Sequence, residues 1–136
     1  MTIEVFFYGL FMDQTILSKN GIVPSNPRKG HLNNYALKIG NRASLIPSKG
    51  EQSYGIVLSC DADTIRKLYS EASVADYIPE QVEVITEPNG TVQATGYNLP
   101  SELLTGTNTA YAESLYILAK QKGFPENYLE KIKKMG

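Results

Sequence analysis

The sequence predicts a single domain of the α+β class. Its 136 residues fit one domain rather than two, and a hydrophobic content of 42% is ordinary for a globular chain. Strand-like segments occupy the first two thirds of the chain, whereas apolar residues recur at helical spacing in the last third. Strands followed by helices favour an α+β fold over a repeated βαβ arrangement. With no internal repeat or linker, residues 1–136 are expected to form one unit.

The N-terminal part predicts a strand, a short helix and a loop. Ile3–Tyr8 is rich in β-branched and aromatic residues and stops at Gly9, which is typical of a buried strand. Phe11–Leu17 can form one or two helical turns. Residues 23–27 contain two prolines and predict a loop.

Strand patterns return at Gly30. Apolar residues alternate over Tyr35–Ile39, which predicts a half-buried strand. Ser48–Glu51 predicts a turn, and Tyr54–Cys60 predicts another strand. Gly55 inside that strand indicates a close approach of another backbone.

The middle of the chain predicts a helix and a hairpin. Asp61 and Asp63 both offer side-chain oxygens that can cap a helix over Ala62–Ala72. Glu80–Glu87 and Thr91–Leu99 are two strands, and the Pro-Asn-Gly sequence at 88–90 joins them as a hairpin.

Two helices are expected at the C-terminus. Asn108 or Thr109 can cap the first, and Gly123 is its natural end. Pro125 is well placed in the first turn of the second. The apolar face of that last helix comprises Tyr128, Leu129 and Ile132.

The charge balance argues against a nucleic-acid partner. Thirteen basic and fourteen acidic residues give a net charge of −1, and the isoelectric point is about 5.8. The short basic run of Lys131, Lys133 and Lys134 is interpreted as a solvated helix end, where cations suit the helix dipole.

Single copies of cysteine and histidine exclude several kinds of site. Cys60 is the only cysteine and His31 the only histidine, so neither an intramolecular disulfide nor a Cys-His zinc site has enough partners. Cys60 ends an apolar run and is expected to be a buried small hydrophobe. We therefore expect no metal.

The chain is expected to be cytosolic and to have no membrane partner. Its N-terminus lacks the basic and apolar regions of a signal peptide, and no segment approaches the roughly 20 apolar residues that span a bilayer. Without a long exposed apolar run, a protein–protein adaptor has little support, and a monomer or a homodimer is expected.

The turn that follows the first strand is the first candidate site. Phe7–Phe11 runs from a strand into glycine and then a helix start, which can point successive backbone N–H groups at a carboxylate or a carbonyl oxygen. Taken alone, the segment is more often an ordinary turn between a strand and a helix.

Glu71 is the second candidate. On a helix with Ile65 and Leu68, it lies at the border of the apolar stripe and at the negative end of the helix dipole. One interpretation is a solvated surface glutamate. The other is a semi-buried carboxylate whose pKa is raised by desolvation and by the helix end, which suits a general acid/base.

These motifs, taken in order, resemble the gamma-glutamylcyclotransferase-like family. Residues 4 to 134 carry the likeness, which rests on Phe7-Tyr8-Gly9, Gly55-Ile56-Val57, Leu68-Tyr69-Ser70-Glu71, Tyr77, Val82-Glu83-Val84, Tyr111 and Lys122–Tyr128. The resemblance implies a small mixed β-barrel with helices packed outside and a pocket at one end.

The resemblance also implies which residues form the site. It makes Glu71 the catalytic acid/base. It makes the Tyr8 turn, with Gly9, Leu10 and Phe11, a source of main-chain donors to the substrate. The pocket-lining tyrosines of the family correspond to Tyr77 and Tyr111, for which a core aromatic is the competing interpretation.

The implied reaction releases 5-oxoproline from a γ-glutamyl amine or peptide. The α-amine attacks the δ-carbonyl within one molecule, so proximity can supply roughly 7–11 kcal/mol of the barrier. Glu71 would move the proton from the ammonium to the departing amine. Neither a metal nor a cofactor is required.

The sequence departs from the family pattern at three places. Leu10 stands where a serine or threonine is usual, Tyr69 replaces an aspartate, and Ala72 replaces a glycine. These changes favour a more apolar or aromatic amine portion. The rival hypothesis is a non-catalytic member of the same fold that binds a small ligand without turning it over.

Overall fold

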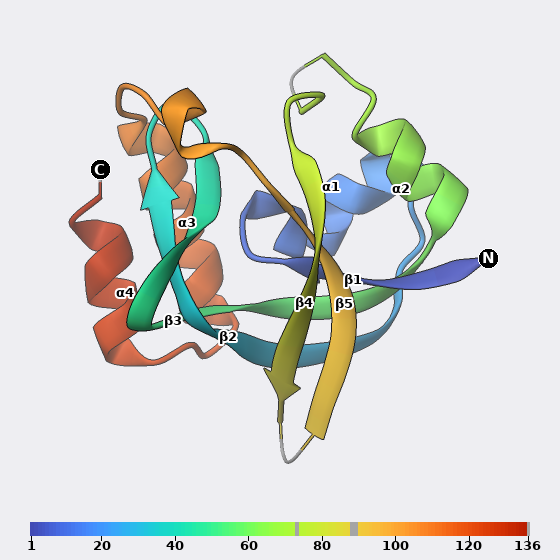
Figure 1. The fold of residues 1–136 in the computed structure, drawn as a ribbon, viewed down its shortest axis with the longest axis horizontal. Coiled ribbons are helices and arrows are strands. Elements are labelled where there is room, and N and C mark those ends of the chain that lie inside the picture. Colours follow the sequence, from blue (N-terminus) through green and yellow to red (C-terminus); the bar gives the residue numbers. More distant parts are fainter. Residues whose placement is uncertain (73, 88–89, 136) are drawn as a thin grey trace.

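The protein is a mixed arrangement of strands and helices (Figure 1). The computed structural model describes residues 1–72, 74–87 and 90–135. Five strands lie in these ranges: β1 (Thr2–Phe7), β2 (Ser25–Ile39), β3 (Ala43–Asp61), β4 (Ile78–Thr86) and β5 (Gly90–Asn98). The α-helices described there are α1 (Gln14–Lys19), α2 (Ala62–Leu68), α3 (Thr109–Gln121) and α4 (Glu126–Lys133), with 3-10 turns η1 (Leu10–Met12) and η2 (Ser101–Leu103). The predicted α+β class is confirmed.

The strands form one sheet that closes on itself in the order β1-β3-β2-β4-β5. Neighbouring strands are antiparallel except at the closure, where β5 pairs with β1 in parallel through Val5↔Thr95 and Phe6↔Gly96. Figure 1 shows α1 and α2 on one side of this sheet, and α3 and α4 beside each other on the opposite side. The helices therefore lie outside the ring of strands.

The core is centred on β1, which lies between β3 and β5. Val5, Phe6 and Phe7 are each at most 2% exposed. A Cβ atom at Gly55 of β3 would lie 2.3 Å from the carbonyl oxygen of Phe7. The close approach predicted at Gly55 is therefore present, and it holds β1 and β3 together where the site begins.

Two predicted irregular segments are part of long strands. The loop expected at 23–27 is wrong from Ser25 onward, because β2 already pairs with β3 there. A bulge between Ser25 and Arg28 absorbs the proline, and Asn26 adopts a φ of 52° within it. The turn expected at 48–51 is likewise a bulge within β3 rather than a break. It lies opposite Asn34, whose side chain accepts a hydrogen bond from the Gly50 amide.

The helix expected over Ala62–Ala72 ends four residues early. Asp61 caps α2 as predicted, accepting from the Thr64 amide, but the helix stops at Leu68. Its last turn tightens, since the Ser70 and Glu71 amides bond to carbonyls three residues back. Glu71 therefore follows the helix, and its predicted place on the last helical turn is wrong.

The helix predicted over Phe11–Leu17 is divided into η1 and α1 by Asp13, which is extended and caps α1. The hairpin and the two C-terminal helices are confirmed. The β4–β5 hairpin pairs Val82 with Ala94 and Val84 with Val92, and its predicted turn at 88–90 lies partly outside the described residues. Asn108 caps α3, and α4 begins directly after Pro125.

Cys60 is buried as a small hydrophobe, and burial raises the pKa of its thiol to about 11. The expectation of an unreactive core thiol is therefore confirmed.

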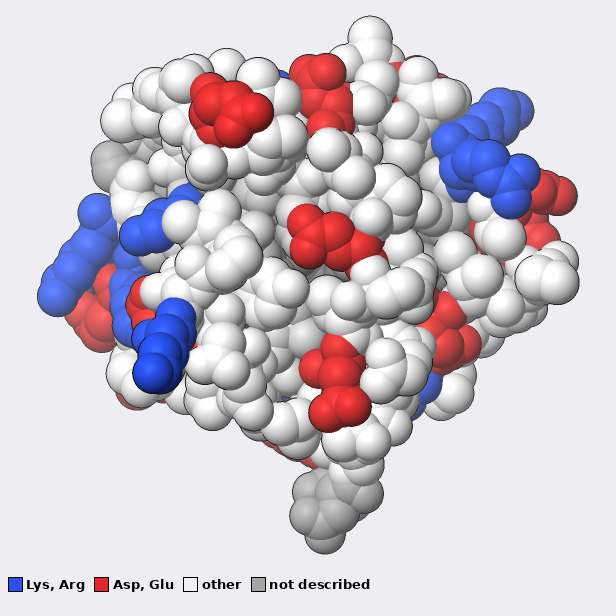
Figure 2. Space-filling model, in the orientation of Figure 1, with Lys and Arg blue, Asp and Glu red and all other residues white. Residues whose placement is uncertain are grey.

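The visible surface carries both signs of charge. On the face shown in Figure 2, acidic side chains are scattered over the centre and basic side chains lie toward the edges. Among the described residues, no helix is long and apolar enough to cross a membrane.

The contact between β1 and β3 predicts the effect of enlarging Gly55. In Gly55→Ala the new methyl group meets the Phe7 carbonyl at 2.3 Å and the Phe6 ring at 2.7 Å, so the strands must separate. We expect the free energy of unfolding to fall by roughly 1–3 kcal/mol, measured by urea denaturation.

Gly96→Ala is the matched control on β5. Its added methyl group would meet its nearest neighbour, Val82, at an ordinary 3.7 Å. Equal stability losses in the two variants would contradict a specific role for the close approach at Gly55.

Candidate functional site

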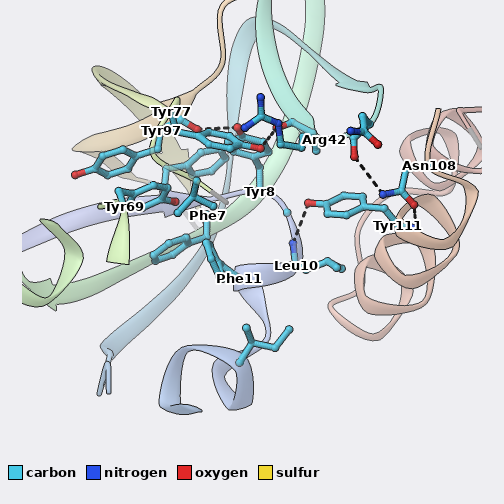
Figure 3. A pocket seen from close by; sticks show the side chains of 16 residues that line it. Phe7, Tyr8, Leu10, Phe11, Arg42, Tyr69, Tyr77, Tyr97, Asn108 and Tyr111 are labelled. Atoms are coloured by element: carbon cyan, nitrogen blue, oxygen red, sulfur yellow. Dashed lines mark hydrogen bonds between the residues drawn. The ribbon is translucent and has the colours of Figure 1, made fainter. Parts of the chain in front are cut away.

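A cavity of about 410 Å³ opens at the end of the sheet. Its volume falls in the usual range for small-molecule sites. The walls come from the turn after β1, the β2–β3 turn, the segment between α2 and β4, β5, and the start of α3 (Figure 3). Eight of its sixteen lining residues are aromatic: Phe6, Phe7, Tyr8, Phe11, Tyr69, Tyr77, Tyr97 and Tyr111. The others are Gly9, Leu10, Ile16, Asn41, Arg42, Ala43, Val74 and Asn108.

The turn after β1 is held against the start of α3. The Leu10 amide donates a hydrogen bond to the Tyr111 hydroxyl at 3.3 Å. The Asn108 side chain caps α3 by accepting a hydrogen bond from the Tyr111 amide at 3.0 Å. This bond fixes the backbone position from which the Tyr111 side chain extends. A Cβ atom at Gly9 would lie 2.4 Å from the Tyr111 hydroxyl oxygen, so only glycine leaves room for this contact.

The opposite wall is a cluster of rings that we call the aromatic shelf: Phe11, Tyr69 and Tyr97. Tyr69 and Tyr97 stack with centroids 3.8 Å apart and planes 8° from parallel. Phe11 meets Tyr69 edge-on at 6.1 Å. Figure 3 shows the shelf on one side of the cavity and Tyr111 with Asn108 on the other. The shelf presents an apolar surface suited to a flat or apolar group.

Two more tyrosines tie this wall to the strands. The Tyr8 hydroxyl donates to the Tyr97 carbonyl at 2.7 Å, and the Tyr77 hydroxyl donates to the Ala43 carbonyl at 2.6 Å. Tyr77 also lies 6.1 Å from the ring of Tyr69. These bonds fix the orientation of the Tyr8 ring, which directly follows β1, and of the Tyr77 ring in the segment before β4.

Burial keeps the tyrosine hydroxyls protonated. Desolvation raises the pKa of Tyr8, Tyr69 and Tyr111 above the ordinary value, and it raises the pKa of Tyr77 to about 12. At neutral pH each hydroxyl can donate a hydrogen bond, but none is a base.

Arg42 is the one charged side chain among the described residues that line the cavity. Its Nη1 lies 3.3 Å from Asp76 Oδ2, and its guanidinium carbon lies 6.0 Å from the centroid of the Tyr77 ring. The Arg42 side chain is 29% exposed and the Asp76 side chain 57%. Sequence reasoning missed Arg42, because an arginine after Gly40-Asn41 is indistinguishable from an ordinary turn residue.

Glu71 does not line the cavity. It is exposed, and its backbone carbonyl accepts from the Val74 amide at 3.0 Å in the turn that follows α2. The expectation of a semi-buried carboxylate is therefore wrong for this conformation. Glu71 nevertheless belongs to the segment 69–77, from which Tyr69, Val74 and Tyr77 do reach the cavity. Its chemical role stays a prediction.

The structure brings the other predicted site residues into one cavity, namely Tyr8, Gly9, Leu10, Phe11, Tyr77 and Tyr111. It adds Tyr69, Tyr97, Arg42 and Asn108. Tyr69 had a signal in the sequence, since it stands where the family has an aspartate, but that substitution does not by itself indicate a place in the cavity wall. Within the described ranges, no group of three or more His, Cys, Asp or Glu side chains is placed to hold a metal ion.

Comparisons with known proteins identify the fold. No protein-family model matches the sequence, and no curated protein matches it. Among solved structures, a gamma-glutamyl cyclotransferase superposes with a TM-score of 0.79 at 18% identity, covering 100% of this chain and 89% of the other.

Two further structures have the same arrangement. YkqA from Bacillus subtilis gives a TM-score of 0.78 at 18% identity, covering 98% of this chain and 54% of that protein. An AIG2-like protein from Mus musculus gives 0.57 at 18% identity, covering 79% of this chain and 86% of the other. The chain therefore shares its fold with these solved structures, a gamma-glutamyl cyclotransferase among them.

Proposed function

We propose that this protein is a cyclotransferase that releases 5-oxoproline from a γ-glutamyl amine with an apolar or aromatic amine portion. The observation that carries the proposal is the cavity itself. In a gamma-glutamylcyclotransferase-like fold, it combines the turn Gly9–Phe11 with the aromatic shelf. The turn suits the polar head of such a substrate, and the shelf suits its amine portion.

The reaction needs few groups from the protein. The α-amine nitrogen of the substrate attacks its own δ-carbonyl carbon, a C–N bond forms in the new ring, and the amide C–N bond breaks. The proton lost by the attacking nitrogen goes to the departing amine. Holding the chain folded into this geometry can supply roughly 7–11 kcal/mol, and backbone N–H groups of the turn can stabilise the oxyanion.

Glu71 is the proposed carrier of that proton. The tyrosines that line the cavity are excluded as bases, because burial raises their pKa values. Asp76 is already paired with Arg42 at 3.3 Å. Glu71 lies two residues from Tyr69 and three from Val74, both of which line the cavity. Its side chain has to turn inward when substrate binds.

The aromatic shelf supports the proposed substrate class. Leu10 stands where a serine or threonine is usual in the family, and it lines the cavity together with Phe11 of the shelf. Moving an apolar amine portion from water to such a wall costs no hydrogen bonds. A charged or peptide-like portion would have unpaired polar groups there, which costs free energy. We therefore place γ-glutamyl amines with aromatic or branched apolar groups ahead of glutathione-like peptides.

A non-catalytic ligand-binding role is the second candidate. The observation that favours it is the absence of any carboxylate among the described residues that line the cavity. In this case the cavity would hold the same class of molecule without cleaving it.

The decisive measurement is 5-oxoproline release from γ-glutamyl phenethylamide and a panel of γ-glutamyl dipeptides. We expect release by the wild type and a fall of about 10²–10⁴-fold in kcat for Glu71→Gln, because proton transfer by a positioned group contributes that much. Glu113→Gln, an exposed carboxylate on α3, is the matched control and should retain full activity.

Two outcomes would contradict parts of this proposal. Release that survives in Glu71→Gln would remove Glu71 from the reaction and leave the activity in place. Tight binding without release across the panel would identify the protein as the ligand-binding member.

The pKa of Tyr77 predicts a pH dependence of stability. Its folded value of about 12 lies above the unfolded value, so the folded state holds this proton more tightly. The resulting stabilisation is fully present below about pH 10 and is lost as pH rises through the folded value.

We expect the difference in unfolding free energy between wild type and Tyr77→Phe to stay constant from pH 7 to about 10 and to shrink above it. Urea denaturation at a series of pH values measures this difference. A difference that remains constant up to pH 11.5 would show that Tyr77 is not perturbed in the folded protein.

A further inference from the structure

Arg42 stands out in a cavity whose walls are otherwise neutral. It is the one charged side chain among the described lining residues, and most of the remaining lining is aromatic. A guanidinium has five N–H donors in a planar fork, and the structure gives Arg42 one polar partner, Asp76, among the described residues. That partner is more than half exposed and does not line the cavity. Among the described residues, the hydrogen bond shown for the guanidinium therefore uses one of its N–H donors and goes to a residue outside the cavity lining.

The backbone around Arg42 is held in place from two directions. The Asn41 amide donates to the Thr105 carbonyl at 2.6 Å, and the Asn108 side chain donates to the Asn41 carbonyl at 3.1 Å. These bonds fix the β2–β3 turn against the segment that leads into α3. Figure 3 shows Arg42 between the ring cluster and the side that carries Tyr111 and Asn108. The cation therefore has a defined position between the two walls.

The turn after β1 has fewer free hydrogen-bond donors for a carboxylate than the sequence suggests. The Leu10 amide is directed at the Tyr111 hydroxyl, and Leu10 itself has no hydroxyl group to donate. A substrate carboxylate in this cavity needs another donor. A planar guanidinium in a partly desolvated site is the side chain best suited to bind a carboxylate through two parallel bonds.

We propose that Arg42 is a specificity-determining residue that binds the α-carboxylate of the γ-glutamyl head. The amine portion then lies on the aromatic shelf, and the oxyanion is left to the amides of the turn other than that of Leu10, which is bonded to Tyr111. Asp76 holds the guanidinium from outside and does not contact the ligand. This assignment rests on the proposed function for the identity of the ligand, but it concerns binding and not turnover.

Two amides that cannot cyclise provide the test. Glutaryl phenethylamide keeps the carboxylate of the γ-glutamyl compound and lacks its α-amine. Butanoyl phenethylamide lacks the carboxylate as well. Their dissociation constants, measured by isothermal titration calorimetry, isolate the contribution of the carboxylate without any reaction.

We expect the wild type to bind the glutaryl compound about 10- to 100-fold more tightly than the butanoyl compound, as for a hydrogen bond between charged groups. Arg42→Gln should reduce this preference to near one, and Arg42→Lys should keep part of it, since lysine retains the charge without the planar fork. The affinity for the butanoyl compound should change little in either variant.

Asp76→Asn is the control for the ion pair, and Arg66→Gln is the control for loss of a surface arginine. Asp76→Asn removes the partner of Arg42 but keeps the guanidinium, so the preference should persist. Arg66 is paired with Asp63 on the exposed side of α2, and its loss should leave both affinities unchanged. Thermal melting of each variant confirms that it is folded.

Three results would overturn the proposal: equal affinities for the two compounds in the wild type, an undiminished preference in Arg42→Gln, or no binding of either compound. A carboxylate preference that depends on Arg42, together with no release of 5-oxoproline from γ-glutamyl phenethylamide, would instead overturn only the proposed reaction. The two proposals therefore fail separately.

Discussion

The pairing of β1 with both β3 and β5 is the constraint on which the rest of the structure depends. β1 closes the sheet through its parallel contact with β5 and packs against Gly55 of β3 on its other edge. Because both edges are hydrogen-bonded, the end of β1 has one position. The turn that follows, Gly9–Phe11, is thereby placed at the mouth of the cavity, and α3 closes over it through Tyr111.

The same closure gathers aromatic rings from distant parts of the chain. Tyr8 leaves β1, Tyr97 lies on β5, and Tyr69 follows α2, yet the three are linked by a hydrogen bond and a stacked contact. Burial raises the pKa values of these hydroxyls, so the walls are neutral donors over the physiological range. In such surroundings one cation has a large effect, because few other groups compete for an anionic ligand.

The residues of the cavity wall and the Glu71 carboxylate are held differently. Arg42, Tyr77 and Tyr111 are fixed by hydrogen bonds to neighbouring backbone or side chains. Glu71 lies outside the cavity in the turn after α2, with an exposed side chain. The two proposals above assign ligand binding to the fixed wall and proton transfer to Glu71, so each has its own experimental consequences.

The fold class, the β4–β5 hairpin and the helices α3 and α4 could be predicted from the sequence. These features depend on local periodicity, capping residues and turn residues. The resemblance to a known family also pointed to the turn after β1 and to the tyrosines at 77 and 111, which do line the cavity. The extents of β2 and β3 were misjudged, because bulges at prolines and glycines look like loops when the partner strand is unknown.

Tertiary structure alone decided the composition of the cavity. The early end of α2, followed by Tyr69 stacked on Tyr97, placed Glu71 outside the cavity although periodicity put it on the border of the helix's apolar stripe. Arg42 and Asn108 enter the site because the β2–β3 turn is bonded to the segment before α3, a contact between residues 67 positions apart. Local patterns carry no information about such long-range contacts, since they form only when the sheet closes and brings its two ends together.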